Sequence, residues 1–175
     1  MICLEKILEY KVKCPICGSK INVSEYLYEA PYVGKLIISS GTCFNCKYKW
    51  SDVRLAESRG PRRIIYRVED VKDLNALVIR SSTATVKIPE IEVEIIPGLA
   101  AQGYITTIEG IVMDIYEKTK FLCSEKEAPK EKCSEKLELL KKAMNGEIKY
   151  TVVIEDPMGV SAIVSHKTVE EELKT

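Results

Sequence analysis

Residues 14–46 read CPICGSKINVSEYLYEAPYVGKLIISSGTCFNC, and this stretch begins and ends with two cysteines in a Cys-x-x-Cys pair. Two thiolates at this spacing can bind one ion from a single tight turn, and two such turns complete a tetrahedral shell of four sulfurs. Zinc is the metal that such a shell favours. We therefore predict one structural zinc ion, which leaves no coordination position for a substrate. Its four ligands are Cys14, Cys17, Cys43 and Cys46.

The 25 residues between the two pairs are rich in β-branched and aromatic side chains and are interrupted from Pro31 to Gly34. This pattern predicts the β-hairpin of a zinc ribbon, which we assign to residues 1–56. A module of this size cannot bury enough apolar surface to fold alone, so metal binding is expected to supply its folding free energy. A redox role for the two pairs is the alternative, and the presence of two copies makes it the weaker interpretation.

Three further cysteines, Cys3, Cys123 and Cys133, have no partner at metal-binding spacing. A free cysteine is usually a small buried hydrophobic residue, and this is the interpretation that we favour for all three. Cys123 and Cys133 flank a predicted turn between two helices, so a disulfide between them is the alternative if the source is a thermophile that tolerates intracellular disulfides.

The composition restricts the class of function. The chain of 175 residues has 26 basic and 26 acidic side chains and therefore no formal net charge, which argues against bulk electrostatic capture of nucleic acid as its main function. The longest uncharged run, residues 95–108, is shorter than the roughly 20 apolar residues of a membrane span. The N-terminus shows no secretory signal, so we expect a cytoplasmic protein with no membrane association.

A basic segment follows the second cysteine pair. Residues 47–67 contain seven Lys or Arg side chains against Asp52 and Glu57 only. The segment is either a solvated linker or a docking surface for an acidic partner, and Trp50 either caps the small core of the ribbon or anchors that partner. The candidate partner-binding residues are Lys47, Lys49, Trp50, Arg54, Arg59, Arg62 and Arg63.

Residues 57–175 are predicted to form a second, β-rich domain. Alternation of apolar and polar residues predicts strands in several stretches, and the acidic row Glu90, Glu92 and Glu94 is expected on a solvated face. The last ten residues, 166–175, are polar and are expected to fray. The predicted strands cover residues 62–69, 75–80, 84–88, 91–96, 148–155 and 160–165.

A helical hairpin interrupts these strands at about residues 106–146. Thr106 and Glu109 have the spacing of a capping box, and apolar residues then recur at helical spacing through Leu122. A turn at 124–129 precedes a second helix at 130–145, which Gly146 is placed to end. We expect the hairpin to pack on the sheet, and a partner-binding arm is the alternative.

The sequence contains no recognisable catalytic constellation. His166 is the only histidine, no nucleophile motif accompanies it, and no glycine-rich phosphate loop is present. A metal-dependent pocket in a β-rich domain usually needs clustered histidines. We therefore expect a protein that is not an enzyme and has no small-molecule substrate.

Several separated motifs together resemble one family, the ZPR-type zinc finger proteins of eukaryotes and archaea, and specifically its single-copy, archaeal-type members. The match extends from Cys14 to Ser161 and therefore covers most of the chain. The residues that carry it are Cys14-Pro-Ile-Cys17-Gly18, Cys43-Phe-Asn-Cys46 with Tyr48, Ile88-Pro89-Glu90-Ile91 with Glu94 and Pro97-Gly98, Ile105-Thr106-Thr107-Ile108-Glu109-Gly110, and Asp156-Pro157-Met158-Gly159-Val160-Ser161.

The resemblance implies a mainly β fold. Its parts are a four-cysteine finger similar to that of the translation initiation factor 2 beta subunit and a double-stranded β-helix-like domain that carries a helical hairpin. The sequence departs from the family pattern at Lys47, where a glycine is usual, and at Val160, where an asparagine is usual. Both departures concern local contacts of the fold.

The resemblance also implies a partner, the translation elongation factor GTPase that delivers aminoacyl-tRNA. Eukaryotic members are linked to the folding of that GTPase and also to receptor tyrosine kinases, which a single-copy archaeal-type protein is not expected to meet. Our leading hypothesis is a zinc-binding adaptor or folding chaperone for the elongation factor. An RNA-binding zinc ribbon is the alternative, with nucleic acid otherwise a secondary partner.

Overall fold

The computed structural model describes residues 4–30 and 33–173, so Cys3 and Pro31 lie outside the described part of the chain. The strands are β1 (Glu5–Lys13), β2 (Lys20–Ala30), β3 (Gly34–Thr42), β4 (Lys49–Leu55), β5 (Arg62–Val68), β6 (Leu77–Arg80), β7 (Thr85–Ile88), β8 (Val93–Ile95), β9 (Tyr104–Thr107), β10 (Tyr150–Asp156), β11 (Ala162–Val164) and β12 (Val169–Glu172). The helices are the short 3-10 helices η1 (Val71–Asn75) and η2 (Pro89–Ile91) and the α-helices α1 (Ile108–Cys123) and α2 (Lys130–Met144).

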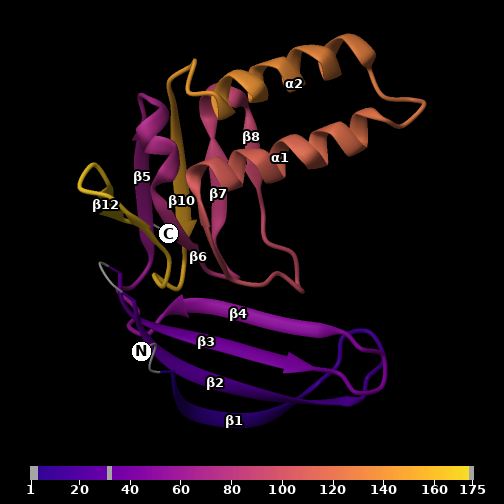
Figure 1. Ribbon diagram of the computed structural model, residues 1–175, viewed down its shortest axis with the longest axis vertical. Coiled ribbons are helices and arrows are strands. Elements are labelled where there is room, and N and C mark those ends of the chain that lie inside the picture. The colour runs from indigo at the N-terminus through magenta and orange to yellow at the C-terminus, as the bar shows by residue number, and fades with distance from the viewer. Residues whose placement is uncertain (1–3, 31–32, 174–175) are drawn as a thin grey trace.

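The first four strands form one antiparallel sheet in the order β1-β2-β3-β4. Strands β2 and β3 are the predicted hairpin, and alternation along β2 buries Ile21 and Val23 while Lys20 and Asn22 remain exposed. Strand β1 was not predicted, because nearly all of its side chains are exposed and show no clear alternation. The sheet lies across one end of the rest of the molecule (Figure 1).

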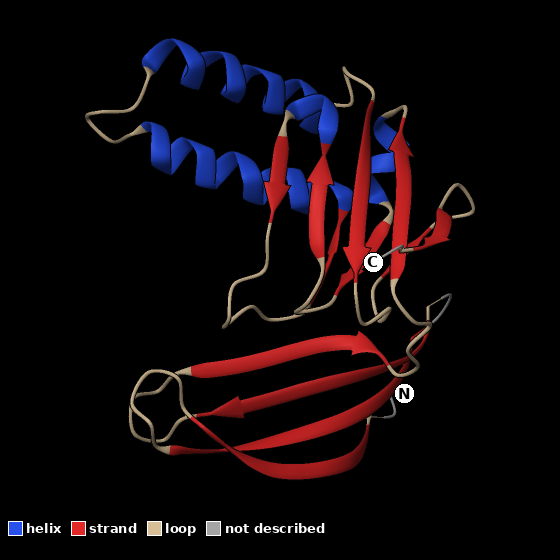
Figure 2. Ribbon diagram, turned by 180° about the vertical axis from the view of Figure 1, so that it is seen from behind, coloured by secondary structure: helices blue, strands red, loops and turns tan. Residues whose placement is uncertain are grey.

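The remaining strands form two antiparallel sheets, in the orders β12-β5-β10-β7-β8 and β11-β6-β9. Both sheets and both α-helices contribute to one hydrophobic core, in which Tyr66 and Tyr150 are the largest fully buried side chains. The helices lie side by side along one face and extend beyond the edge of the strands (Figures 1 and 2). The predicted double-stranded β-helix-like domain, also called a jelly roll, with an inserted helical hairpin is therefore confirmed.

The predicted start of the first helix was wrong by one residue. Thr107, not Thr106, is the N-cap, because its Oγ1 accepts a hydrogen bond of 3.1 Å from the backbone N–H of Gly110. Thr106 instead belongs to β9, where it pairs with Val78. The competing strand pairing could not be inferred from the local sequence, since both threonines precede the same apolar stripe.

A disulfide joins Cys123, the last residue of α1, to Cys133 in α2. The interpretation that both cysteines are free thiols was therefore wrong. The ten-residue separation contains the turn between two antiparallel helices, and this turn brings the two Cα atoms to 5.7 Å from each other. The disulfide was the alternative interpretation and is confirmed; spacing alone did not favour it, because the partners meet only after the hairpin has formed.

The last residues of the described chain form a strand, so the expectation of a fraying tail was wrong. Strand β12 pairs with β5, and the backbone N–H of Leu173 donates to the carbonyl oxygen of Pro61. All four side chains of β12 are exposed. The strand is therefore held by backbone pairing without an apolar face, which is why residue pattern did not predict it.

The three glutamates of the predicted acidic row are exposed, as expected, but they do not lie on one strand. Glu90 precedes β8 and accepts hydrogen bonds from the backbone N–H and the hydroxyl of Thr151, whereas Glu92 adopts a left-handed conformation. Glu94 forms an ion pair with Lys87 on the neighbouring strand. Of the strand predicted at residues 91–96, only β8 is extended, and its apolar residues Val93 and Ile95 pack against the core.

The β1–β4 sheet meets the jelly roll along β4. The backbone N–H of Leu55 donates to the carbonyl oxygen of Val160 at 2.9 Å, and the backbone N–H of Gly103 donates to Oδ1 of Asp52 at 2.6 Å. A Cβ at position 103 would lie 2.3 Å from the carbonyl oxygen of Val53. Glycine is required at this position because two backbones approach each other closely.

The motif at residues 156–161 is a loop held by hydrogen bonds to the Asp156 carboxylate. The fully buried Asp156 carboxylate accepts hydrogen bonds from the backbone N–H groups of Met158 and Val160 and from the hydroxyls of Ser161 and Thr83. Burial alone would raise the pKa of Asp156, but these hydrogen bonds outweigh burial and hold that pKa below its usual value. The motif therefore has a structural role in holding the turn that β4 contacts.

Candidate metal centre

Two turns of the β1–β4 sheet bring the four predicted ligands together. The Sγ atoms of Cys14, Cys17, Cys43 and Cys46 all lie within 4.8 Å of one another. The Sγ atoms of Cys14 and Cys46 are 3.5 Å apart, as are those of Cys17 and Cys43. A zinc tetrahedron with metal–sulfur bonds of about 2.3 Å has sulfur–sulfur edges of about 3.8 Å. The cluster therefore fits one zinc ion, and the prediction of a zinc cofactor is confirmed.

The electrostatics of the cluster also favour a cation. Hydrogen bonds from Ser19 and Asn45 lower the pKa of the Cys17 thiol to about 5. A backbone N–H from Tyr48 acts to lower the pKa of Cys46 as well, but burial and the neighbouring sulfurs outweigh it and raise that pKa to about 12. Thiols this close resist losing all their protons together, because the thiolates repel each other. A divalent ion removes that repulsion.

The two metal-binding turns have the same backbone geometry. In the first turn, the N–H of Cys14 donates to the carbonyl oxygen of Ser19 and the N–H of Gly18 donates to that of Cys14. In the second, the corresponding bonds run from Cys43 to Tyr48 and from Lys47 to Cys43. Gly18 and Lys47 both have left-handed conformations, with φ of 71° and 62°. The second turn therefore holds a lysine where the first uses glycine.

Replacing Lys47 with glycine is expected to stabilise the zinc-loaded protein by about 0.5 to 1 kcal/mol. The left-handed conformation costs a residue with a Cβ about 1–2 kcal/mol, and glycine avoids this cost. The greater conformational freedom of glycine in the unfolded chain offsets part of the stabilisation. Gly18→Ala is the matched control and is expected to destabilise by a similar amount, since a Cβ at Gly18 meets nothing within 4 Å and only φ is affected. Urea unfolding with excess zinc measures both. A destabilised Lys47→Gly protein would contradict the argument.

The metal centre has its own small hydrophobic core, separate from that of the jelly roll. Cys14 and Cys43 are buried with Ile21 and Val23, and Trp50 packs against this cluster with Tyr10, Cys46 and Tyr48. The interpretation of Trp50 as a cap on the ribbon core is therefore confirmed. The other sequence-predicted partner residues do not belong to this core.

The basic segment is not a linker, because it forms β4, a loop and β5. Four of its arginines are already paired with acids: Arg54 with Glu25 and Asp52, Arg59 with Glu170, Arg63 with Glu155, and Arg67 with Glu69. Arg62 lies half-buried at the start of β5. Lys47 and Lys49 lie beside the metal centre. The structure thus separates the seven predicted residues into two lysines near the metal, one packed tryptophan and four arginines on or near the jelly roll.

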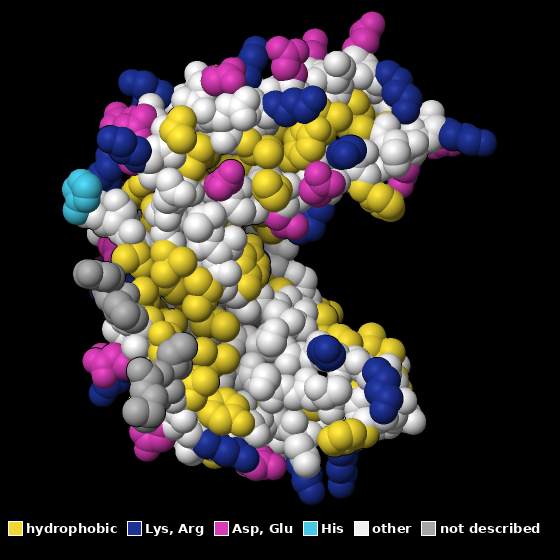
Figure 3. Space-filling view, in the orientation of Figure 1, with side chains coloured by type: hydrophobic (Ala, Val, Ile, Leu, Met, Phe, Trp, Pro, Cys, Tyr) yellow, Lys and Arg dark blue, Asp and Glu magenta, His cyan; other side chains and the backbone are white. Residues whose placement is uncertain are grey.

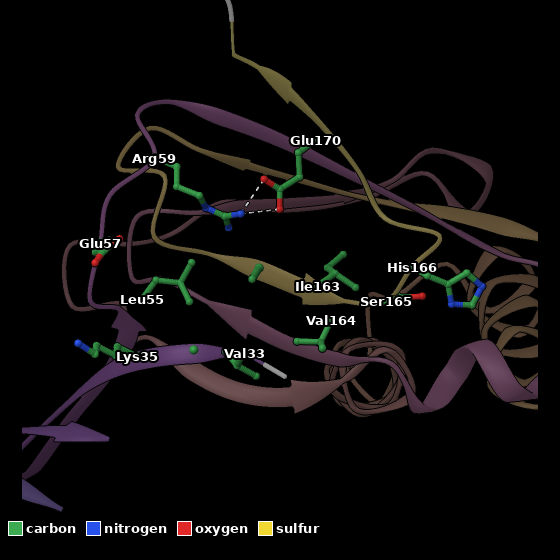
Figure 4. A pocket seen from close by; sticks show the side chains of 12 residues that line it. Val33, Lys35, Leu55, Glu57, Arg59, Ile163, Val164, Ser165, His166 and Glu170 are labelled. Atoms are coloured by element: carbon green, nitrogen blue, oxygen red, sulfur yellow. Dashed lines mark hydrogen bonds and ion pairs between the residues drawn. The ribbon is translucent and has the colours of Figure 1, made fainter. Parts of the chain in front are cut away.

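Arg59 and His166 line a pocket between the β1–β4 sheet and the jelly roll. The pocket has a volume of about 620 Å³ and an apolar floor that includes Leu55 and Ile163. Figure 4 shows Arg59 and Glu170 joined across its rim, where their side chains are 2.8–2.9 Å apart, while His166 lies at the opposite end. Arg59 also donates to the carbonyl oxygen of Ser161 at 2.9 Å. Its guanidinium therefore holds the C-terminal strand to the turn at 156–161.

The end of the ribbon that carries the metal exposes a mixed basic and apolar surface, which we call the metal tip. Each metal-binding turn projects one large apolar side chain, Ile16 with 68% and Phe44 with 76% of its surface exposed. Figure 3 shows basic and hydrophobic side chains gathered on this lobe of the molecule. Around the two turns lie five exposed lysines, Lys11, Lys13, Lys20, Lys47 and Lys49.

No lysine of the metal tip forms an ion pair with any residue in the described ranges 4–30 and 33–173. Sequence reasoning named only two of the five, because it followed the basic excess after the second cysteine pair. The available signal was that residues 11–24 and 40–51 contain no acidic side chain at all. The hairpin brings these two segments to the same end of the sheet.

Comparison with known proteins gives matches along nearly the whole chain. A model of the ZPR1 zinc-finger domain matches residues 6–59, and a model of the ZPR1 jelly-roll domain matches residues 72–175. An uncharacterized ZPR1-like protein of Methanocaldococcus jannaschii is 36% identical over 167 residues, which cover 93% of this chain and 84% of that protein. A similar protein of Pyrococcus horikoshii is 33% identical over 97% of this chain and 79% of its own length.

A eukaryotic relative is longer. The zinc finger chaperone zpr1 of Schizosaccharomyces pombe is 32% identical over 166 residues, which cover 90% of this chain but only 35% of the chaperone. The chain therefore spans about a third of that protein. Across the residues that the structure describes, no helix is both long and apolar enough to cross a membrane.

Proposed function

The chain belongs to the ZPR1 family, and from this premise we propose that it is a cytoplasmic, zinc-stabilised adaptor or folding chaperone for the translation elongation factor GTPase that delivers aminoacyl-tRNA. The fission yeast relative is a protein named as a zinc finger chaperone, which supports the chaperone part of the proposal. The resemblance of the sequence motifs supports the choice of partner. The protein acts by binding and has no catalytic step of its own.

The observation that carries the proposal is the metal tip. Ile16 and Phe44 are exposed at the ends of two turns that zinc makes rigid, so presenting them to a partner costs little conformational entropy. The surrounding lysines would meet acidic groups and accelerate encounter, while the apolar side chains would supply affinity in a desolvated pocket. A partner with an acidic surface around an apolar depression fits this chemistry.

The test is a binding titration of the zinc-loaded chain against purified elongation factor of the same organism, nucleotide-free, GDP-bound and partly unfolded. Phe44→Asp is expected to weaken binding at least about tenfold, because it places a charge in the desolvated centre. Leu99→Asp is the matched control, since Leu99 is fully exposed on a jelly-roll loop. The proposal fails if none of the three states binds at micromolar concentration, and the metal tip is excluded if Leu99→Asp alone weakens binding.

An RNA-binding ribbon is the second candidate, and the five lysines with no ion pair in the described ranges favour it. Lysines that bind phosphates displace the counterions of the RNA. The affinity of an RNA complex is therefore expected to fall steeply as salt is added. Phe44 would then serve as a stacking surface for a base. If RNA is the partner, Phe44→Tyr is expected to keep its affinity for RNA, because the aromatic ring is retained. Nuclease treatment is then expected to release the protein from its cellular complexes. A shallow salt dependence with an intact protein complex after nuclease treatment favours the elongation factor.

A further inference from the structure

Among the strands of the described residues, β1 is an unpaired edge of the ribbon sheet. It is the terminal strand in the order β1-β2-β3-β4, and both ribbon views place it on the side away from the jelly roll (Figures 1 and 2). Its register is interrupted between Lys6 and Leu8, and the continuous part that follows, residues 8–13, carries exposed apolar side chains, among them Leu8 with 52% and Val12 with 36% of their surface accessible. A long edge of this kind is a template for pairing with another strand. The question is which strand fits it.

The register of β1 with β2 assigns each side chain to a face. Leu8, Tyr10 and Val12 pair with Glu25, Val23 and Ile21, which are buried, so these three lie on the inner face of the sheet. Because side chains alternate along a strand, Glu9 and Lys11 lie on the outer face. An occupant of the edge must therefore offer apolar groups on one face and charges of the right sign on the other.

A second copy of β1 meets both requirements in one antiparallel register, centred on Tyr10. Leu8 of each copy then lies opposite Val12 of the other on the inner face, and Glu9 of each lies opposite Lys11 of the other on the outer face. Shifting the register by two residues toward either end places Glu9 opposite Glu9 or Lys11 opposite Lys11, which is unfavourable. Of these three registers, the Tyr10-centred one alone pairs Leu8 with Val12 and Glu9 with Lys11.

We propose that the chain forms a two-fold symmetric dimer in solution by antiparallel pairing of β1 with β1 of a second copy. The pairing joins two ribbons into one continuous sheet, β4-β3-β2-β1 followed by β1-β2-β3-β4 of the second copy. Such an interface is isologous, so each favourable cross-strand pair occurs twice. The two metal centres then lie on opposite sides of the axis, at the two ends of the paired segment, since Cys14 follows β1 directly.

The test uses the complementarity of the charges in the zinc-loaded full chain. The variant Glu9→Lys places a lysine opposite Lys11 at both ends of the interface, and Lys11→Glu places a glutamate opposite Glu9 at both ends. Each variant is therefore expected to dimerise at least about tenfold more weakly than the native chain. A mixture of the two variants restores opposite charges at both positions and is expected to form a heterodimer. The measurement is sedimentation velocity over a range of concentrations, with zinc content and circular dichroism to verify folding.

Two controls separate pairing of β1 from other effects. Glu9 also forms an ion pair with Lys6 of its own chain, and Lys6→Ala removes that pair without changing the proposed interface, so it is expected to leave dimerisation unchanged. The double variant Glu9→Lys, Lys11→Glu is expected to dimerise like the native chain. A native chain that stays monomeric at all concentrations, or a dimer that persists in both single variants, overturns the proposal.

Discussion

Removal of zinc is expected to unfold the β1–β4 sheet while the jelly roll stays folded. The apparent binding free energy of a structural four-ligand zinc site is about 10–16 kcal/mol, and the ribbon has only the small cluster around Cys14 and Cys43 to replace it. The core of the jelly roll contains none of these residues. We therefore expect residues 1–56 and 57–175 to lose structure separately.

Hydrogen exchange read by mass spectrometry measures this effect by segment. Peptides from β2 and β3 should lose protection in a strong chelator, while peptides from β5 and β10 keep it. The variant Cys43→Ser, Cys46→Ser is the control, because its ribbon should already be unprotected and should not respond to the chelator. Protection of β2 that survives complete zinc removal would contradict the prediction.

The second large effect is expected for Gly159→Ala, which should lower the free energy of unfolding by about 4 kcal/mol. Gly159 has φ of 61°, and a Cβ there would lie 1.9 Å from the carbonyl oxygen of Gly60. The clash is with backbone, so no side-chain rotation relieves it. The turn at 156–161 and the loop after β4 must separate instead.

Gly60→Ala is the matched control for this prediction. Gly60 also has a left-handed conformation, with φ of 73°, but a Cβ there meets nothing within 4 Å. Its substitution is expected to cost about 1 kcal/mol, from the backbone conformation alone. Urea unfolding followed by far-ultraviolet circular dichroism measures both variants. Equal decreases in the free energy of unfolding of the two variants would show that the close contact between residue 159 and Gly60 does not affect stability.

Those elements whose side chains alternate or repeat could be predicted from the sequence. The metal ligands were predictable because two thiolates per turn is a local requirement, and strands such as β10 were predictable because apolar residues recur along them. The helical hairpin was predictable from its apolar stripe. In each case the residues that form the element also carry the pattern.

The elements that were missed depend on partners distant in the chain. Strand β12 has four exposed side chains and exists because β5 offers a free edge. The Cys123–Cys133 disulfide was only the less favoured interpretation, because it requires that α1 and α2 turn back on each other. The metal tip was missed in part because Lys11, Lys13 and Lys20 precede the hairpin that brings them beside Lys47 and Lys49. The pattern of apolar and polar residues predicts whether a side chain is buried or exposed. It does not predict which residues the fold brings beside that side chain from the other side of a turn.

The matching geometry of the two metal-binding turns also has a kinetic consequence. Each turn is closed by its own short-range hydrogen bonds, so each can present two sulfurs before the sheet exists. Closing a turn of a few residues takes far less time than bringing together ends separated by a 25-residue segment. During synthesis, the first turn emerges from the ribosome before the second and can hold the ion with two thiolates. We therefore expect capture of zinc in two separate steps, with formation of the β2–β3 hairpin setting the rate of the second.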